Sequence, residues 1–226
     1  MDTVLAQAII DLKVPYFGES LKNKGDSRSC LFDPRKLLSS PKILEHIGKK
    51  IAHMAKTECR GGALIGMATS GIAWAAVASF FSDLPMLYVR KKLEKQMSSR
   101  YIEGIPPKDK KLILVDDLLF AGESKSEAIE IIHEHGFKVT DVIVIIDRQL
   151  QRKKDGPSIQ NKYHLKLHVL ITMSEIVEYM VKNHSITELQ LSNLVDDYQR
   201  FERWEIPTFA KKAANKHIYR PRKEIP

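Results

Sequence analysis

Two adjacent carboxylates, Asp116 and Asp117, are the residues of this chain whose type and spacing best suit chemistry. They directly follow the apolar run 112–115. A run of this kind predicts a strand that is buried on both faces. We expect the two acids to lie at the carboxyl end of that strand, where open parallel sheets bind their ligands.

The loop after the acids is suited to an anion. We expect Ser124 to cap a helix that begins near Lys125, so that free backbone N–H groups point into the loop. Those donors favour a phosphate, while the acids suit the hydroxyls of a sugar or a hydrated Mg²⁺. The stretch therefore predicts a site for a sugar phosphate with a metal. Taken alone, it could also be a strand end with two solvated acids and an ordinary helix cap.

Composition predicts one soluble domain. The chain has 226 residues, of which 43% are hydrophobic and 28% charged, and it contains neither a signal pattern nor a run of about 20 apolar residues. Its two cysteines, Cys30 and Cys59, predict free thiols rather than a disulfide framework or a metal-ligand cluster. The net charge of +8 fits either nucleic acid or substrates that carry several negative charges. We expect a cytoplasmic protein.

Helical and strand patterns alternate along the chain. Apolar periodicity predicts helices at 43–56, 72–81 and 125–135, and strands at 63–66, 86–89, 112–115, 142–146 and 168–171. This alternation predicts an α/β fold, with a mostly parallel central sheet and helices on both faces.

The C-terminal part predicts two capped helices and then a basic tail. The capping boxes are Thr172 with Glu175 and Ser185 with Glu188. Residues 205–226 contain six Lys or Arg side chains and two Glu side chains. The segments 91–110 and 150–164 are polar and are predicted to be long loops.

The stretch from Leu112 to Ser124 resembles the phosphoribosyl pyrophosphate (PRPP) motif of type I phosphoribosyltransferases, in which two acids follow a hydrophobic strand and precede a small-residue phosphate loop. The order of the other motifs is similar to that of the orotate branch of this family, over roughly residues 4–203. The resemblance implies a type I phosphoribosyltransferase fold. Its parts would be a small N-terminal hood (1–40), a core with C-terminal helices (41–204) and the basic tail (205–226).

Four segments carry the resemblance to PRPP sites. They are the Phe17–Lys22 segment, the tight loop Gly66–Gly71, the entry to a catalytic loop at Tyr88–Lys92, and the acid pair with its loop. The implied catalytic residues are Asp116, Asp117 and Lys91. The implied PRPP-binding residues are Lys22, Thr69, Ser70, Arg90, Lys91, Lys95, Asp116, Asp117, Phe120, Ala121, Gly122, Glu123 and Ser124.

Two residues are implied to bind orotate. Arg148, within Asp147–Gln149, matches the arginine that holds the orotate ring and its carboxylate in the family, and Phe32 matches an aromatic wall of that pocket. Without the resemblance, Arg148 reads as a surface arginine after a strand and Phe32 as a core aromatic.

The chain departs from the family pattern at several positions. Ser70 stands where a lysine is common, Phe120 replaces a threonine, and Glu94 and Gln96 fall where a lysine and a histidine or tyrosine are usual. Lys92 or Lys95 could supply the missing loop charge.

The resemblance implies an enzyme of pyrimidine synthesis that joins orotate to PRPP, giving orotidine 5′-monophosphate and pyrophosphate. Mg²⁺ would be carried by PRPP, without direct protein ligands. The implied assembly is a homodimer in which Arg90 and Lys91 act across the interface, with no membrane or nucleic-acid partner. The departures leave two alternatives: a PRPP- or nucleotide-binding protein with little or no turnover, and a transferase for another base.

Overall fold

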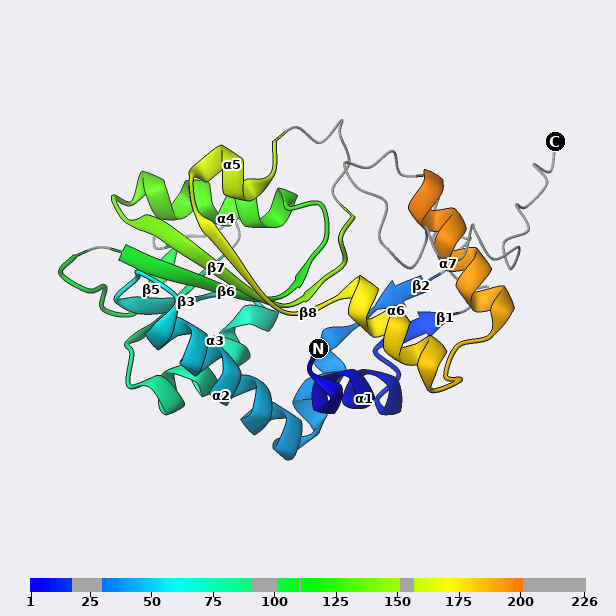
Figure 1. Cartoon of the computed structure of the whole chain (residues 1–226). Helices are drawn as coiled ribbons and strands as arrows, with labels where there is room; N and C mark the ends of the chain where they lie inside the picture. The colour runs from blue at the N-terminus through cyan, green and yellow to red at the C-terminus, as the bar shows by residue number, and fades with distance from the viewer. Residues whose placement is uncertain (18–29, 91–100, 110, 151–156, 201–226) are drawn as a thin grey trace.

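The computed structural model describes residues 1–17, 30–90, 101–109, 111–150 and 157–200. A six-stranded sheet in the order β5-β4-β3-β6-β7-β8 forms its centre (Figure 1). The strands are β3 (Ala63–Met67), β4 (Met86–Val89), β5 (Ile102–Glu103), β6 (Lys111–Leu119), β7 (Lys138–Asp147) and β8 (Lys166–Thr172). The edge strand β5 is antiparallel to β4, and all other neighbours are parallel. The predicted α/β class with a mostly parallel sheet is confirmed.

Helices cover both faces of the sheet. α2 (Pro41–Thr57) and α3 (Ser70–Ser82) lie on one face, and α4 (Glu123–Glu134) and α5 (Ile159–Tyr163) lie on the other (Figure 1). Successive strand residues point to opposite faces. Ile113 and Val115 of β6 therefore join the core under α2 and α3, while Leu112 and Leu114 join the core under α4. This two-sided burial explains why the strands are continuous apolar runs.

A smaller body packs at one end of the sheet. It contains α1 (Thr3–Asp11), the antiparallel pair β1 (Pro15–Phe17) and β2 (Cys30–Phe32), a 3₁₀ helix (Pro34–Ser39), α6 (Met173–Lys182) and α7 (Glu188–Arg200) (Figure 1). Tyr179 on α6 donates a hydrogen bond to Gln7 on α1 at 2.8 Å. We call this body the hood; it differs from the predicted N-terminal hood (1–40) in that it also contains the two C-terminal helices, which were predicted to belong to the core. Among the described residues, no helix has the length and apolarity needed to cross a membrane.

Several local predictions are corrected. β6 continues through the two acids to Leu119, and α4 begins at Glu123, with Gly122 as its cap residue at a φ of 91°. The predicted cap by Ser124 is therefore wrong, since the helix is capped two residues earlier, at a glycine that tolerates positive φ. The short elements α5 and β5 lie in segments that were predicted to be loops.

One of the two predicted capping boxes is confirmed. Thr172 and Glu175 cap α6 reciprocally. The second box is displaced by two residues, because Thr187 and Gln190, rather than Ser185 and Glu188, exchange hydrogen bonds at 3.0 and 3.2 Å. Either pair fits the spacing of a capping box, and only the start of the helix distinguishes them.

Candidate active site

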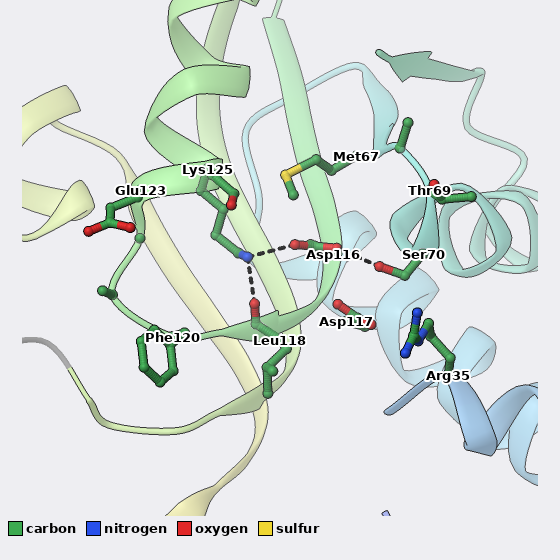
Figure 2. Close-up of a pocket in the computed structure, with 14 residues that line it drawn as sticks. Arg35, Met67, Thr69, Ser70, Asp116, Asp117, Leu118, Phe120, Glu123 and Lys125 are labelled. Atoms are coloured by element: carbon green, nitrogen blue, oxygen red, sulfur yellow. Dashed lines mark hydrogen bonds and ion pairs between the residues drawn. The ribbon is translucent and has the colours of Figure 1, made fainter. Parts of the chain in front are cut away.

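A pocket of about 340 Å³ lies at the carboxyl ends of β3 and β6. The chain leaves β3 toward β4 on one side, whereas it leaves β6 toward β7 on the other. This reversal is the topological switch point at which open α/β sheets bind ligands. The pocket is lined by the segment 67–70 after β3, the segment 116–125 except Leu119, and Arg35 from the hood (Figure 2).

Two glycines let the loop after β3 lie against the end of β6. A Cβ atom on Gly71 would stand 2.3 Å from the carbonyl oxygen of Val115, and one on Gly66 would stand 2.7 Å from that of Gly71. Neither position can hold a larger residue without a backbone shift. The close approach brings Ser70 to the acids, and its hydroxyl donates to Asp116 Oδ1 at 3.3 Å. The peptide bond between Ala68 and Thr69 in this loop is cis.

A buried lysine lies beside the acids. Lys125 Nζ is 2.6 Å from Asp116 Oδ2 and donates to the carbonyl oxygen of Leu118 at 2.5 Å (Figure 2). The side chains of Lys125 and Asp116 are 4% and 3% exposed. Sequence reasoning missed Lys125 as a site residue, because a lysine in the first turn of a helix normally reads as solvated. It places a positive charge in a pocket whose loop has Ser70 in place of the expected lysine.

Asp117 has a different environment from its neighbour. Burial, reinforced by the adjacent Asp116 carboxylate, raises the pKa of Asp117 to about 6, although Ser70 and Lys125 act in the opposite direction. Among the described residues, Asp117 forms no ion pair like that of Asp116 with Lys125, so its charge is the less well compensated of the two. Strongly perturbed acids in a pocket are typical of functional sites.

The predicted phosphate loop lines the opposite side of the pocket. Phe120, Ala121, Gly122, Glu123 and Ser124 all contribute to it. The loop leads directly into the N-terminus of α4, whose first backbone N–H groups have no partner within the helix and attract anions. Figure 2 shows the Glu123 carboxylate pointing away from the two acids. Its charge is thus directed away from the centre of the site.

The predicted orotate-binding pair lies together next to this pocket. The guanidinium carbon of Arg148 is 4.9 Å from the ring centre of Phe32 and 5.3 Å from that of Phe120. Arg148 is 3% exposed, so it is not the surface arginine that its position after a strand would suggest. Its Nε atom is buried and has no hydrogen-bond partner among the described residues. Phe120 belongs to both sets of residues, because it contacts Arg148 and also lines the pocket.

The backbone around Arg148 is tied to three elements. Its N–H donates to the carbonyl oxygen of Leu119 at 3.0 Å, and its own carbonyl oxygen accepts from the hydroxyl of Tyr198 on α7. Gln149 Oε1 accepts from the hydroxyl and backbone N–H of Ser174 on α6, at 2.7 and 2.9 Å. The hood therefore fixes the residue that we expect to recognise the base.

The remaining predicted residues lie apart from this pocket or outside the described chain. Arg90 is 3.3 Å from Glu103 and lines a much smaller cavity with Met67 and Ser124. The other predicted cations and the departures in the catalytic loop lie outside the described residues: Lys22, Lys91, Lys92, Lys95, Glu94 and Gln96.

Arg35 is a second pocket residue that sequence reasoning did not select. It pairs with Asp33 at 2.6 Å through Nε and lines the pocket from the hood side (Figure 2). It lies three residues after Phe32, the residue that matches the aromatic wall of the orotate pocket, and this was the available signal. An exposed arginine at a pocket mouth is well suited to a substrate phosphate or carboxylate.

The chain matches the family described as phosphoribosyl transferase domain over residues 36–168. It is 30% identical over 173 residues to an orotate phosphoribosyltransferase from Listeria monocytogenes, covering 76% of this chain and 81% of the relative. It is 30% identical over 184 residues to one from Pyrococcus abyssi, covering 79% and 96%. The crystal structure of orotate phosphoribosyltransferase from Aeropyrum pernix superposes with a TM-score of 0.66 at 25% identity, covering 79% and 98%.

These likenesses agree with the switch-point pocket and its acid pair. The chain belongs to the phosphoribosyltransferase family, and within it to the orotate phosphoribosyltransferases.

Proposed function

We propose that this protein transfers the phosphoribosyl group of PRPP to orotate, giving orotidine 5′-monophosphate and pyrophosphate in pyrimidine synthesis. One observation carries the proposal: a single pocket at the β3–β6 switch point joins an acid pair to the N-terminus of α4. Acids suit the ribose hydroxyls, and the helix N-terminus suits a phosphate. The relatives named above are orotate phosphoribosyltransferases.

The residues of the pocket have distinct tasks in this proposal. Asp117, with the outward lone pairs of Asp116, accepts hydrogen bonds from the ribose hydroxyls. The backbone N–H groups from Ala121 to Ser124 hold the 5′-phosphate, and the loop with Thr69 and Ser70 faces the pyrophosphate. The protein then acts mainly by orienting two anionic substrates and by stabilising charge on the departing pyrophosphate.

The pocket fits Mg²⁺ that arrives with PRPP. Its charged oxygen donors are carboxylates, the hard ligands that Mg²⁺ prefers. One of them, Asp116, already has Lys125 at 2.6 Å, which leaves few protein ligands and agrees with a metal held mainly by the substrate. When bound, Mg²⁺ would neutralise charge on the pyrophosphate group.

Arg148 is the proposed recognition residue for orotate. Its guanidinium lies near the faces of two aromatic rings, an arrangement that holds the group flat and limits its rotation. A planar guanidinium can form paired hydrogen bonds to a carboxylate. Its unpaired Nε among the described residues supports a ligand-binding role.

A direct assay tests the proposal. Orotate absorbance is followed with the full chain, PRPP and Mg²⁺, and we expect a decrease that requires all three. Uracil, adenine and hypoxanthine in place of orotate test the alternative of another base. Asp117→Asn should abolish the signal, whereas an exposed control such as Glu45→Gln should not. An unchanged orotate spectrum at high enzyme concentration would contradict the proposal.

The second candidate, PRPP or nucleotide binding with little turnover, is favoured by the internal ion pair. Lys125 already compensates the charge of Asp116 within the protein, where a metal carried by the substrate would otherwise do so. Calorimetry separates the two candidates, because a binding protein takes up PRPP with Mg²⁺ while orotate absorbance stays constant. We further propose a cytoplasmic homodimer in which Arg90 and Lys91 reach the site of the partner subunit.

A further inference from the structure

A second cluster of ligand-type side chains lies at the amino end of the sheet. Cys59 follows the end of α2, Asp141 is on β7 and His168 is on β8. One ligand atom from each lies within 4.8 Å of the others. Asp141 pairs with Ile113 near the start of β6, whereas Asp116 and Asp117 lie toward its carboxyl end. The cluster is therefore separate from the substrate pocket.

The sheet brings the three side chains onto one face. Asp141 lies two residues before Ile143, which pairs with His168 and belongs to the core under α2. Residues two apart on a strand share a face, so Asp141 and His168 are diagonal neighbours on the side covered by α2. Cys59 packs against the same core. The sequence did not indicate a cluster because its members are far apart in the chain.

We propose that Cys59, Asp141 and His168 bind a zinc ion, with a water in the fourth position. Thiolate, imidazole and carboxylate together are a donor set that zinc prefers, and Mg²⁺ or Ca²⁺ would not select the sulfur. Tetrahedral zinc holds such ligand atoms roughly 3.3–3.6 Å apart. His168 Nε2 and Asp141 Oδ1 are already 3.0 Å apart. The thiol, placed just after the last helical turn, needs the larger adjustment.

The groups behind the ligands are arranged as in a metal site. His168 Nδ1 lies 3.4 Å from Glu58 Oε2, so the carboxylate orients the imidazole with Nε2 toward the cluster. The second oxygen of Asp141 accepts from the backbone N–H of Arg60 at 3.0 Å. Carboxylate–histidine–metal arrangements of this kind fix ring orientation and raise ligand strength. Asp141 is fully buried, so it can offer its carboxylate to a divalent ion away from bulk solvent.

Cobalt spectroscopy of the full chain tests this site. Chelator-treated protein is titrated with Co²⁺, which reports thiolate coordination by a charge-transfer band in the near ultraviolet, and then with Zn²⁺, which should displace it at one ion per chain. Zn²⁺ should also raise the melting temperature, because it binds only the folded state. Absence of a thiolate band in the wild-type protein would overturn the proposal without any variant.

Matched variants assign the ligands. Cys59→Ser should remove the band. Cys30→Ala, which replaces the other cysteine of the chain, located on β2, should keep it. Glu58→Gln should weaken Zn²⁺ binding by about 10- to 100-fold while retaining the band. Asp117→Asn should not affect it. A band that survives Cys59→Ser, or that disappears with Asp117→Asn, would show that the metal is bound elsewhere and that Asp141 and His168 form only a hydrogen-bonded pair.

Discussion

Lys125 and Asp116 form a buried ion pair inside the substrate pocket, with Nζ and Oδ2 2.6 Å apart. Asp117, the next residue, has no such partner in the part of the chain that the structure describes, and burial raises its pKa to about 6. The two acids of one motif therefore differ in how the protein compensates their charge.

Removing the lysine should destabilise the protein strongly. Lys125→Met keeps the length of the side chain but leaves the Asp116 carboxylate buried without its cation, which typically costs about 3–5 kcal/mol in the free energy of unfolding. Urea denaturation measures this cost, and Lys125→Met with Asp116→Asn should recover most of it. Lys162→Met removes the exposed pair with Glu130 and should have little effect. If Lys125→Met and Lys162→Met unfolded at the same urea concentration, the prediction would be contradicted.

Replacing Asp117 should change the free energy of unfolding in the opposite direction. The folded-state pKa lies above the ordinary value of 3.8, so the folded protein holds this proton more tightly than the unfolded chain does. Stability attributable to Asp117 is therefore present below about pH 4 and is lost as pH rises toward 6. At pH 7 we expect Asp117→Asn to stabilise the unliganded protein by roughly 1–3 kcal/mol, while PRPP binding is abolished.

Thermal melts of wild type and Asp117→Asn between pH 4 and pH 8 check this effect. The difference in melting temperature should vanish at the acid end, where both side chains are neutral. A difference that does not change with pH would mean that the substitution acts through packing instead of charge.

Arg148→Ala should weaken orotate more than PRPP. Loss of a charged hydrogen-bonding partner predicts an increase in KM for orotate of about 10- to 100-fold. Arg148→Lys should restore little, because an ammonium group cannot replace a planar guanidinium held between Phe32 and Phe120. Steady-state kinetics with each substrate varied in turn separates the effects. Equal increases for both substrates would make Arg148 a structural residue.

Gly71→Ala should damage the PRPP site through the backbone. The new Cβ would stand 2.3 Å from the Val115 carbonyl oxygen, which forces the loop away from the acids and costs about 1–3 kcal/mol as an overpacking strain. Gly62→Ala is the control, since the atoms nearest to its Cβ would belong to the movable Asp109 side chain, at 3.2 Å or more. PRPP calorimetry should show weakened binding for the first variant alone.

Sharing of active sites predicts complementation between defective chains. In a refolded equal mixture of Arg90→Ala and Asp117→Asn chains, a hybrid dimer has one intact site, so about a quarter of the wild-type activity should return. Each variant alone should be nearly inactive. A fully active wild-type species that elutes as a monomer would refute the shared site.

The strands of the sheet and the position of the acid motif could be predicted, because parallel strands buried on both faces consist of nearly continuous apolar residues. The burial of the polar residues in the site was harder to predict from the sequence. The motif was expected to lie at a strand end outside the core, yet Asp116 and Asp117 are 2% and 8% exposed. Lys125 satisfies Asp116 from the next helix, a relationship that depends on the turn at Gly122 rather than on any periodicity.

Short elements and helix starts were also difficult to predict. α5 has five residues, too few to establish a helical period. The cap of α7 could have been Ser185 or Thr187 by spacing alone, and in the structure it is Thr187 that bonds to Gln190. Arg148 read as a surface residue because the groups around it, the Phe32 ring and the Tyr198 hydroxyl, come from segments far away along the chain.

The hood has a consequence for the order in which the chain can fold. Gln7 and Tyr179, which join α1 to α6, are 172 residues apart, whereas the sheet is assembled from strands that are closer in sequence. During synthesis, α1 emerges before α6 and can pack first on α2, where its cap residue Asp2 pairs with His46 and Lys50, so only its contact with α6 has to wait. We expect the sheet to form before α6 closes the hood against α1, and the base-recognition residue to be fixed last. Contacts between such distant segments slow folding, so substrate binding should appear later than sheet structure when the unfolded chain is returned to native conditions.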